Sequence, residues 1–230
     1  MDGKVVVVTG ALGALGKVVA SVAQARGARV AGVDHAHAQT PATPTRIELG
    51  GVDLSDAAQA KQAIDAAASH FGRLDALINI AGGFAFETVA EGDSKGESTT
   101  WQRMYALNVA TALNASRAAL SHLASAGAGR IVNIGAIGAL QAGAGMGAYA
   151  ASKAGVHRLT EALAAEWKGK ITVNAVLPSI IDTAANRASM PNADFTKWVT
   201  PQELAEVILF LTSDAASAIT GALIPVSGRV

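Results

Sequence analysis

The chain has 230 residues, of which 50% are hydrophobic and 16% are charged, and it contains no cysteine. Its 18 lysines and arginines balance 18 aspartates and glutamates, so no excess of positive charge favours a nucleic acid or an acidic membrane as a partner. Disulfides and thiolate metal sites are excluded, and no apolar run approaches the roughly 20 residues of a membrane span. We therefore expect a cytoplasmic protein.

The first 80 residues alternate short β-rich runs with alanine-rich helical stretches. Four runs are predicted to be strands: residues 4–9, 29–34, 47–49 and 74–79. A helix over residues 14–26 is expected to end at Gly27, and Ser55 is expected to cap a second helix that runs to about Phe71. The valine run at residues 5–8 is typical of a strand that is buried on both faces of a parallel sheet.

The alternation continues after an irregular segment at residues 84–99. The sequence predicts helices at 100–126 and 147–167 and strands at 130–134 and 171–177, whereas residues 178–199 show no clear periodicity. Thr200-Pro201-Gln202-Glu203 is a capping box with proline in the first turn, and it predicts a helix to Leu211 before a last strand at 223–226. Because no repeat or linker interrupts the pattern, we expect one α/β domain, residues 1–230, with a doubly wound parallel sheet.

A glycine-rich turn joins the first predicted strand to the first helix. It contains Gly10, Gly13 and Gly16, which allow the backbone to turn sharply and to approach a pyrophosphate at the helix N-terminus. A tight turn without a ligand is the alternative, but the position between a first strand and a first helix favours a dinucleotide site.

The end of the second predicted strand indicates which dinucleotide is preferred. Asp34 lies 18 residues after Gly16, close to the spacing at which a carboxylate accepts hydrogen bonds from the adenosine ribose hydroxyls. A carboxylate there repels a 2′-phosphate, so NAD(H) is favoured over NADP(H).

Further motifs make the chain similar to the short-chain dehydrogenase/reductase family over nearly its whole length. They are the glycine loop with Ala14 in place of a usual glycine, Asp53 in GVDLSD, Asn79-Ile80-Ala81-Gly82, Asn108 in LNV, Tyr149-x3-Lys153 and Pro178-Ser179-x-Ile181-x-Thr183. Each motif alone is weak, but their order and spacing together are specific. The resemblance implies a Rossmann-type fold, NAD(H) as cofactor, a small-molecule substrate, and a homodimer or homotetramer formed through the helices at 100–126 and 147–167.

The resemblance also assigns roles to residues. It implies that Tyr149 and Lys153 are catalytic and that Asn108 holds a water on the proton relay. The residues implied to bind the cofactor are Gly10, Leu12, Gly13, Ala14, Leu15, Gly16, Asp34, Asp53, Leu54, Asn79, Ala81, Gly82, Tyr149, Lys153, Pro178, Ile181 and Thr183.

The spacing and chemistry of Tyr149 and Lys153 also favour a catalytic pair without reference to the family. They are four residues apart on a predicted helix and therefore share a face. An ammonium close to a phenol favours the phenolate, so we expect Lys153 to lower the pKa of Tyr149 from about 10 and to make it a proton donor during hydride transfer. The alternative is a tyrosine and a lysine on a partly exposed helix.

One residue that the family normally carries is missing. The family's catalytic serine lies 13 residues before the tyrosine, and that position is Ala136 here. Ser152 belongs to the tyrosine's own helix and is not expected to replace it. Within the family, dihydropteridine reductases resemble this pattern, since they have alanine at this position, GALG in the glycine loop and a similar stretch at residues 186–195.

A missing hydroxyl at position 136 bears on the choice of substrate. Without an oxyanion donor, reduction of a plain ketone should be slower, whereas an electron-poor ring such as quinonoid dihydropterin accepts hydride readily. We therefore expect NADH-dependent reduction of quinonoid dihydropterin or a similar flat, activated ring. The residues expected to meet the substrate are Gly83, Phe84, Ala136, Met146, Asn186 and Trp198.

Two other functions remain open. A general NAD(H)-dependent carbonyl reductase or alcohol dehydrogenase is favoured by Asn108 and disfavoured by Ala136. A non-catalytic NAD-binding sensor is suggested by Ala136 and disfavoured by the retained tyrosine and lysine.

Several other side chains are expected to have structural roles. His35 and His37 form a pair without a third ligand cluster, so we expect a solvated loop and no metal site. His157 is expected at the surface or at a subunit interface. Trp101, Met104 and Tyr105 are expected to pack or to contact another subunit.

Overall fold

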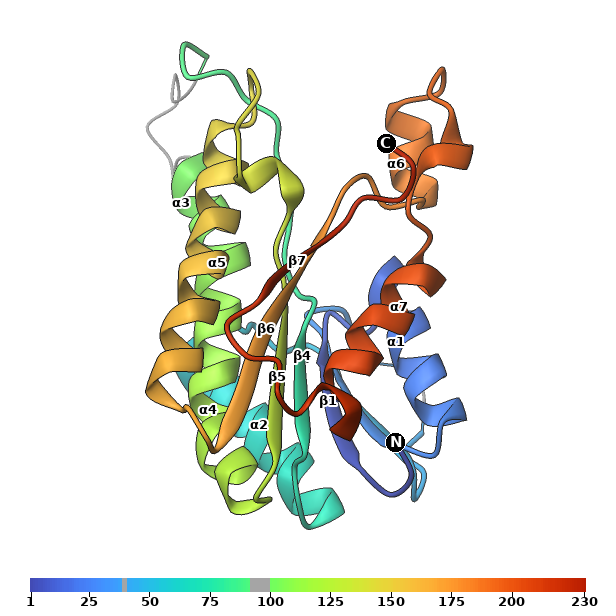
Figure 1. Ribbon diagram of the computed structural model, residues 1–230, viewed down its shortest axis with the longest axis vertical. Coiled ribbons are helices and arrows are strands. Elements are labelled where there is room, and N and C mark those ends of the chain that lie inside the picture. Colours follow the sequence, from blue (N-terminus) through green and yellow to red (C-terminus); the bar gives the residue numbers. More distant parts are fainter. Residues whose placement is uncertain (39–40, 92–99) are drawn as a thin grey trace.

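A central parallel sheet organises the computed structural model, which describes residues 1–38, 41–91 and 100–230 (Figure 1). Within these residues seven strands form one sheet, in which all neighbours are parallel and the order is β3-β2-β1-β4-β5-β6-β7. The strands are β1 (Val5–Thr9), β2 (Arg29–Val33), β3 (Arg46–Leu49), β4 (Ala76–Asn79), β5 (Gly129–Ile134), β6 (Ile171–Pro178) and β7 (Leu223–Val226). The predicted doubly wound parallel sheet is confirmed.

Helices cover both faces of the sheet (Figure 1). One layer contains α2 (Ala57–Phe71), α4 (Thr111–Ser125) and α5 (Gly147–Glu166), and the other contains α1 (Ala14–Ala25) and α7 (Pro201–Leu211). The valine run of β1 shows how one strand serves both layers, since Val5 and Val7 join one buried cluster and Val6 and Val8 join the other. This two-sided burial is the reason that the strand is apolar without alternation.

The strand order reverses beside β1. The chain proceeds from β1 outward through β2 and β3, and then returns to place β4 on the other side of β1. The loops that follow β1 and β4 therefore diverge, which opens a crevice at the carboxyl ends of the strands, where ligands bind in sheets of this kind.

The long helix predicted at 100–126 is not regular. It divides into α3 (Thr100–Met104), a π-helical turn (Tyr105–Ala110) and α4. The buried side chain of Asn108 lies in the π-helical turn and hydrogen-bonds to Gly83 and Ser152, which are distant in sequence. Helical periodicity carries no sign of such a tertiary contact, which explains why the prediction missed the wider turn.

The N-terminus of α2 corrects another prediction. Asp56, not Ser55, caps this helix, because its carboxylate accepts from the N–H groups of Ala58 and Gln59. Ser55 instead donates its hydroxyl to Asp53. The capping box at α7 is confirmed, with Thr200 and Glu203 bonded reciprocally.

Residues 182–198 rise above the sheet as a separate excursion that we call the lid segment (Figure 1). It contains α6 (Ala184–Ser189), which the sequence did not predict, and a short 3-10 turn (Phe195–Lys197). Its two ends are adjacent, because Asp182 N–H donates to Val199 O at 2.7 Å and Val199 N–H donates to Ile180 O at 3.1 Å. No helix in the described part of the chain is long and apolar enough to cross a membrane.

Candidate active site

A groove of about 480 Å³ lies at the carboxyl ends of β1, β2 and β4. Its walls include many of the residues predicted to bind a dinucleotide, namely Gly10, Leu12, Gly13, Ala14, Leu15, Gly16, Asp34, Asp53, Leu54, Ala81 and Gly82. His35, Val52, Leu107 and Thr111 also line it and were not predicted. His35 and Val52 come from loops, Leu107 from the π-helical turn and Thr111 from α4. Val52 and Leu107 belong to the GVDLSD and LNV motifs, whose neighbouring Asp53 and Asn108 were predicted instead.

The glycine loop has the backbone geometry that a pyrophosphate requires. Gly10 has φ +65°, a conformation that favours glycine, and a Cβ on Gly16 would lie only 2.8 Å from the Cα of Ala11. Gly13 is the N-cap of helix α1 and offers no side chain to cap the first-turn N–H groups, and that turn carries no acidic residue. These N–H groups and the helix dipole form a fitting site for a doubly charged phosphate pair.

The Asp34 carboxylate lines the groove and is held by two backbone hydrogen bonds. Its Oδ2 accepts the N–H of Leu12 at 2.8 Å, and its Oδ1 accepts the N–H of Ala36 at 2.9 Å. Each carboxylate oxygen can accept a further hydrogen bond, so the group can hold the glycine loop and still bind ribose hydroxyls. Asp53 lies nearby, and hydrogen bonds from the Ser55 hydroxyl and backbone N–H hold the pKa of this carboxyl below its usual value.

Tyr149 and Lys153 occupy adjacent turns of α5, where Lys153 is buried and Tyr149 is partly buried. Lys153 Nζ donates to Ile134 O at 2.8 Å. Burial lowers the pKa of Lys153 to about 8 and raises the pKa of Tyr149 to about 12. The expected lowering of the Tyr149 pKa is therefore wrong for this structure, because removing the phenolate from water outweighs any attraction by the ammonium.

Asn108 joins the loop after β4 to helix α5. Its Oδ1 accepts the N–H of Gly83 at 3.1 Å, while its Nδ2 donates to Gly83 O and to Ser152 Oγ, each at 3.0 Å. A Cβ on Gly82 would lie 2.5 Å from Asn108 Oδ1 and 3.5 Å from Lys153 Nζ, so this position accepts only glycine. Ser152 is directed towards Asn108, as expected, and does not replace the missing hydroxyl at position 136.

The segment after β4 carries aromatic side chains, and one of them contacts Tyr149. The Phe84 ring meets the Tyr149 ring edge-on, with centroids 5.0 Å apart, and yet Phe84 remains 59% exposed. Phe86 packs against Gly145, where a Cβ would overlap its ring, and Glu87 N–H donates to Gly145 O at 2.9 Å. The segment after β4 thus forms an apolar wall above the tyrosine.

Comparisons with known proteins agree with this geometry. The short chain dehydrogenase family matches residues 4–194. The chain belongs to the short-chain dehydrogenase family. Among curated relatives, D-threitol dehydrogenase of Mycolicibacterium smegmatis is 35% identical over 99% of this chain and 93% of its own length.

Solved structures of short-chain dehydrogenases superpose closely on the chain. A glucose/ribitol dehydrogenase of Brucella melitensis has a TM-score of 0.89 and 27% identity, and covers 99% of this chain and 96% of its own. The 3-ketoacyl-(acyl-carrier-protein) reductase of the same organism, solved in complex with NADH, has a TM-score of 0.85 and 28% identity, with coverage of 99% and 98%.

Some side chains that the family resemblance assigns to the cofactor or the substrate make contacts inside the protein. Asn79 is buried, and its Nδ2 donates to Ser116 and Asn133 inside the protein, so this amide nitrogen is not available to a cofactor. Trp198 is only 3% exposed and packs on Phe195, so a contact with the substrate stays a prediction. Asn79 is polar and Trp198 is aromatic, and each lies close to a motif. Only tertiary packing shows that these side chains point inward.

The remaining assigned residues follow β5 and β6. Ala136 lies two residues after the end of β5 and is 6% exposed, and Met146 precedes the first residue of α5. Pro178 ends β6, and Thr183 caps α6 by accepting the N–H of Asn186. Asn186 Nδ2 donates to Ile181 O at 2.8 Å, which commits that side chain to the base of the lid segment.

Of the three histidines considered in the sequence, one lies in a different environment from the one predicted. His35 and His37 are exposed, whereas His157 is buried and not at the surface. The described residues bring together no group of three side chains that could hold a metal ion. Met104 is buried, while Trp101 and Tyr105 are 47% and 56% exposed.

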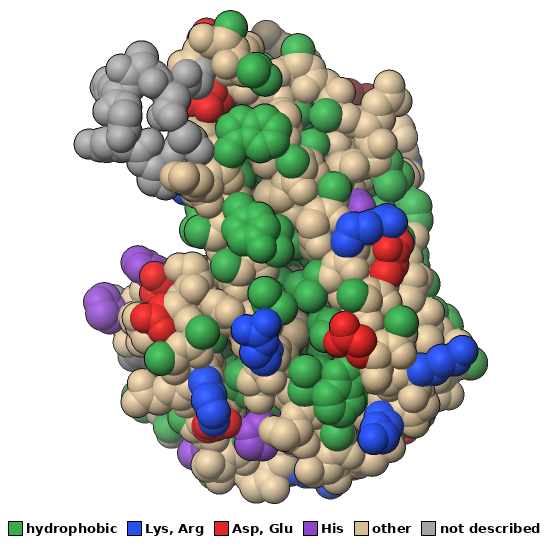
Figure 2. Space-filling model, turned by 90° about the vertical axis from the view of Figure 1, so that its left-hand side faces the viewer, with side chains coloured by type: hydrophobic (Ala, Val, Ile, Leu, Met, Phe, Trp, Pro, Cys, Tyr) green, Lys and Arg blue, Asp and Glu red, His purple; other side chains and the backbone are tan. Residues whose placement is uncertain are grey.

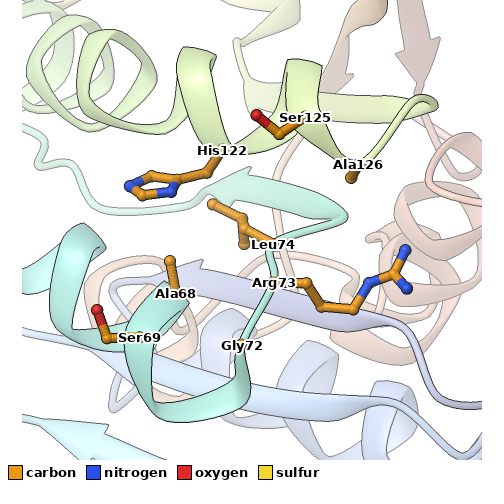
Figure 3. A pocket seen from close by; sticks show the side chains of 8 residues that line it. All are labelled: Ala68, Ser69, Gly72, Arg73, Leu74, His122, Ser125 and Ala126. Atoms are coloured by element: carbon orange, nitrogen blue, oxygen red, sulfur yellow. The ribbon is translucent and has the colours of Figure 1, made fainter.

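A second hollow of about 470 Å³ lies at the opposite end of the molecule, where α2 and α4 end (Figure 3). Figure 3 shows the side chains of His122 and Arg73 directed away from each other. Each already has a carboxylate partner, Asp65 for His122 and Asp75 for Arg73. The hollow therefore lacks a shared polar centre, and it is remote from the tyrosine and lysine.

Proposed function

We propose that the chain is an NAD(H)-dependent oxidoreductase that interconverts secondary alcohols and ketones. The observation that carries this proposal is the groove lined by Asp34, the glycine loop and Gly82, together with Lys153, whose Nζ lies 3.5 Å from the place of a Cβ on Gly82 and which shares helix α5 with Tyr149. The names of the relatives support the same chemistry, since one oxidises an alcohol and another reduces a ketoacyl group.

The chain's own residues carry the proton chemistry. NADH, when bound, supplies a hydride to the carbonyl carbon. Tyr149 remains protonated at neutral pH and donates its phenolic proton to the carbonyl oxygen, which yields the alcohol. Lys153 stabilises the phenolate that remains and binds the nicotinamide ribose, and the phenolate regains its proton from water.

Asp34 supports NAD(H) over NADP(H). Its carboxylate is fixed by two backbone N–H groups at the position where a 2′-phosphate would have to lie. Placing a phosphate against this carboxylate brings two negative charges together, whereas two ribose hydroxyls find acceptors.

The protein is proposed to act in the cytoplasm.

A second candidate is reduction of quinonoid dihydropterin or a similar activated ring. It is favoured by Ala136, which leaves Tyr149 as the side-chain donor to the substrate oxygen, and by the exposed ring of Phe84 beside Tyr149. An electron-poor ring depends less on an oxyanion donor than a plain ketone does.

The deciding experiment follows NADH at 340 nm with purified protein, using NAD+ with a panel of polyols and secondary alcohols, and NADH with ketones and with quinonoid dihydropterin generated in place. Turnover of alcohols or ketones that is lost in Tyr149→Phe supports the proposal. Faster turnover of the pterin replaces it with the second candidate. NADH binding without any turnover indicates a non-catalytic sensor.

Ala136→Ser is the matched gain-of-function variant. A hydroxyl at this position adds a donor to the developing oxyanion, and a donor of this kind is worth on the order of 10²–10³ in rate. We expect ketone turnover to rise and pterin turnover to change little. An equal change for both substrates contradicts the assignment of position 136 to the carbonyl oxygen.

We also propose that two or four copies assemble through the face formed by α4 and α5. Figure 2 shows apolar side chains gathered in the upper half of the face that carries these helices, with charged side chains mainly below. Trp101, Tyr105 and Leu107 are exposed on the neighbouring turns, and α5 presents the small exposed residues Ala151 and Ala162. Small side chains allow two helices to approach closely.

A further inference from the structure

His157 is a buried polar side chain that the proposed chemistry does not use. It is 1% exposed and lies one helical turn after Lys153 on α5. Its Nε2 accepts the N–H of Ala136, with a nitrogen–nitrogen distance of 3.4 Å. The residue thus reaches the turn after β5, where the family's serine would stand.

Glycine at position 135 is what allows this contact. A Cβ on Gly135 would lie 2.7 Å from Cδ2 of His157 and even closer to Nε2. The imidazole ring therefore rests directly on the backbone of Gly135. Any larger residue there would displace the ring or the turn.

The same short stretch of backbone is held a second time by Lys153, whose Nζ donates to Ile134 O at 2.8 Å. Residues 134–136 are therefore held by two side chains of α5 that are four residues apart. Because Nζ is anchored on this turn, a shift of the turn also shifts the ammonium. The position of the ammonium relative to Tyr149 thus depends on a turn that His157 holds in place.

The imidazole has the protonation state that this arrangement needs. Burial, together with the charges of Arg158 and Lys153, holds the pKa of His157 below 6.5, despite the opposing effect of Glu161. A neutral ring at pH 7 can accept at Nε2 while its proton lies on Nδ1.

We propose that His157 is a positioning residue, which fixes the turn at 134–136 through the Ala136 N–H and thereby sets the place of the Lys153 ammonium in the active site. This inference rests on the proposed function only in assigning the nicotinamide ribose to Lys153. It predicts that the loss of one acceptor, remote from the reacting atoms, impairs cofactor binding and turnover together.

The test compares His157→Leu with His157→Gln. Glutamine keeps an acceptor close to the position of Nε2, whereas leucine does not. We expect the NADH Kd to rise about tenfold and kcat to fall about 10- to 100-fold in the leucine variant, as for a misplacement of about 1 Å, with substantial recovery in the glutamine variant. Backbone hydrogen exchange of residues 134–140 should accelerate in the leucine variant and not in the glutamine variant.

A second variant disturbs the same contact without removing a polar group. Gly135→Ala forces the ring away from the turn and should reproduce the leucine variant in Kd, kcat and exchange. Leu163→Ala, at a buried position further along α5, is the control for lost stability: it should lower Tm and leave the NADH Kd unchanged.

Equal NADH Kd values in the wild type and in the leucine variant overturn the inference, and so does a glutamine variant that is no better than leucine. Failure of the proposed function looks different, because it appears as a wild type that turns over no substrate. The Kd and exchange measurements keep their meaning in that case, since neither requires turnover.

Discussion

Lys153 makes the site sensitive to pH in a range where few other groups titrate. Its pKa of about 8 means that the ammonium is charged at pH 7 and becomes neutral above pH 8, whereas Tyr149 stays protonated up to about pH 12. The kcat/KM for NADH reports ionisations of the free protein. We expect it to fall as the pH rises through about 8, and a profile that stays flat from pH 7 to 10 would contradict this role.

The carboxylate of Asp34 should determine the choice between the two nicotinamide cofactors. Asp34→Asn keeps one acceptor but removes the charge, and hydrogen bonds to charged groups contribute about 1.5–3 kcal/mol. We expect kcat/KM with NADH to fall roughly 10- to 100-fold and kcat/KM with NADPH to rise. Asp2→Asn is the control, since this carboxylate is exposed and does not line the groove. An unchanged NADH-to-NADPH ratio in Asp34→Asn would refute the assignment.

Residues whose role depends on local chemistry could be predicted, and residues whose role depends on packing could not. Asp34 and the glycine loop have a fixed spacing along the chain, and the structure places them together. The inward direction of Trp198 and the burial of His157 depend on contacts between segments far apart in sequence. For the same reason the pKa of Tyr149 was misjudged, because the sequence does not show how deeply the phenol is buried.

At the scale of elements, the strands and the capped helices were the most predictable parts. β7 was predicted with its observed bounds, and the capping box of α7 carries its own signal in four consecutive residues. The π-helical turn was missed because its cause, the bonding of Asn108 to Gly83, lies outside the helix. α6 was missed because six residues give too little periodicity.

The capping box also anchors one end of the lid segment. Thr200 follows Val199, which is hydrogen-bonded to Ile180 and Asp182 at the base of that segment. Thr200→Ala removes the cap, which costs about 1 kcal/mol in typical helices. We expect a lower midpoint of urea unfolding and faster tryptic cleavage after Lys197. Gln202→Ala, in the same turn but outside the cap, should change neither, and equal cleavage rates in the two variants would show that the cap does not hold the lid segment.

At the scale of the whole molecule, the testable property is assembly. We expect light scattering to give two or four times the chain mass of 23.1 kDa. Ala162→Arg places a charge on the exposed face of α5 and should shift the protein towards the monomer. Ala25→Arg, on the opposite side of the sheet at the end of α1, should not. A wild type that is monomeric at micromolar concentration would refute this surface as an interface.

The closed base of the lid segment has an evolutionary consequence. Residues 182–198 leave the body of the protein and return to it at neighbouring points, joined by hydrogen bonds of 2.7 and 3.1 Å. Such an excursion can be lengthened, shortened or exchanged with little strain on the strands below it. The length and sequence of this excursion can therefore diverge among descendants of this gene, while β6 and α7, which flank it, are inherited unchanged.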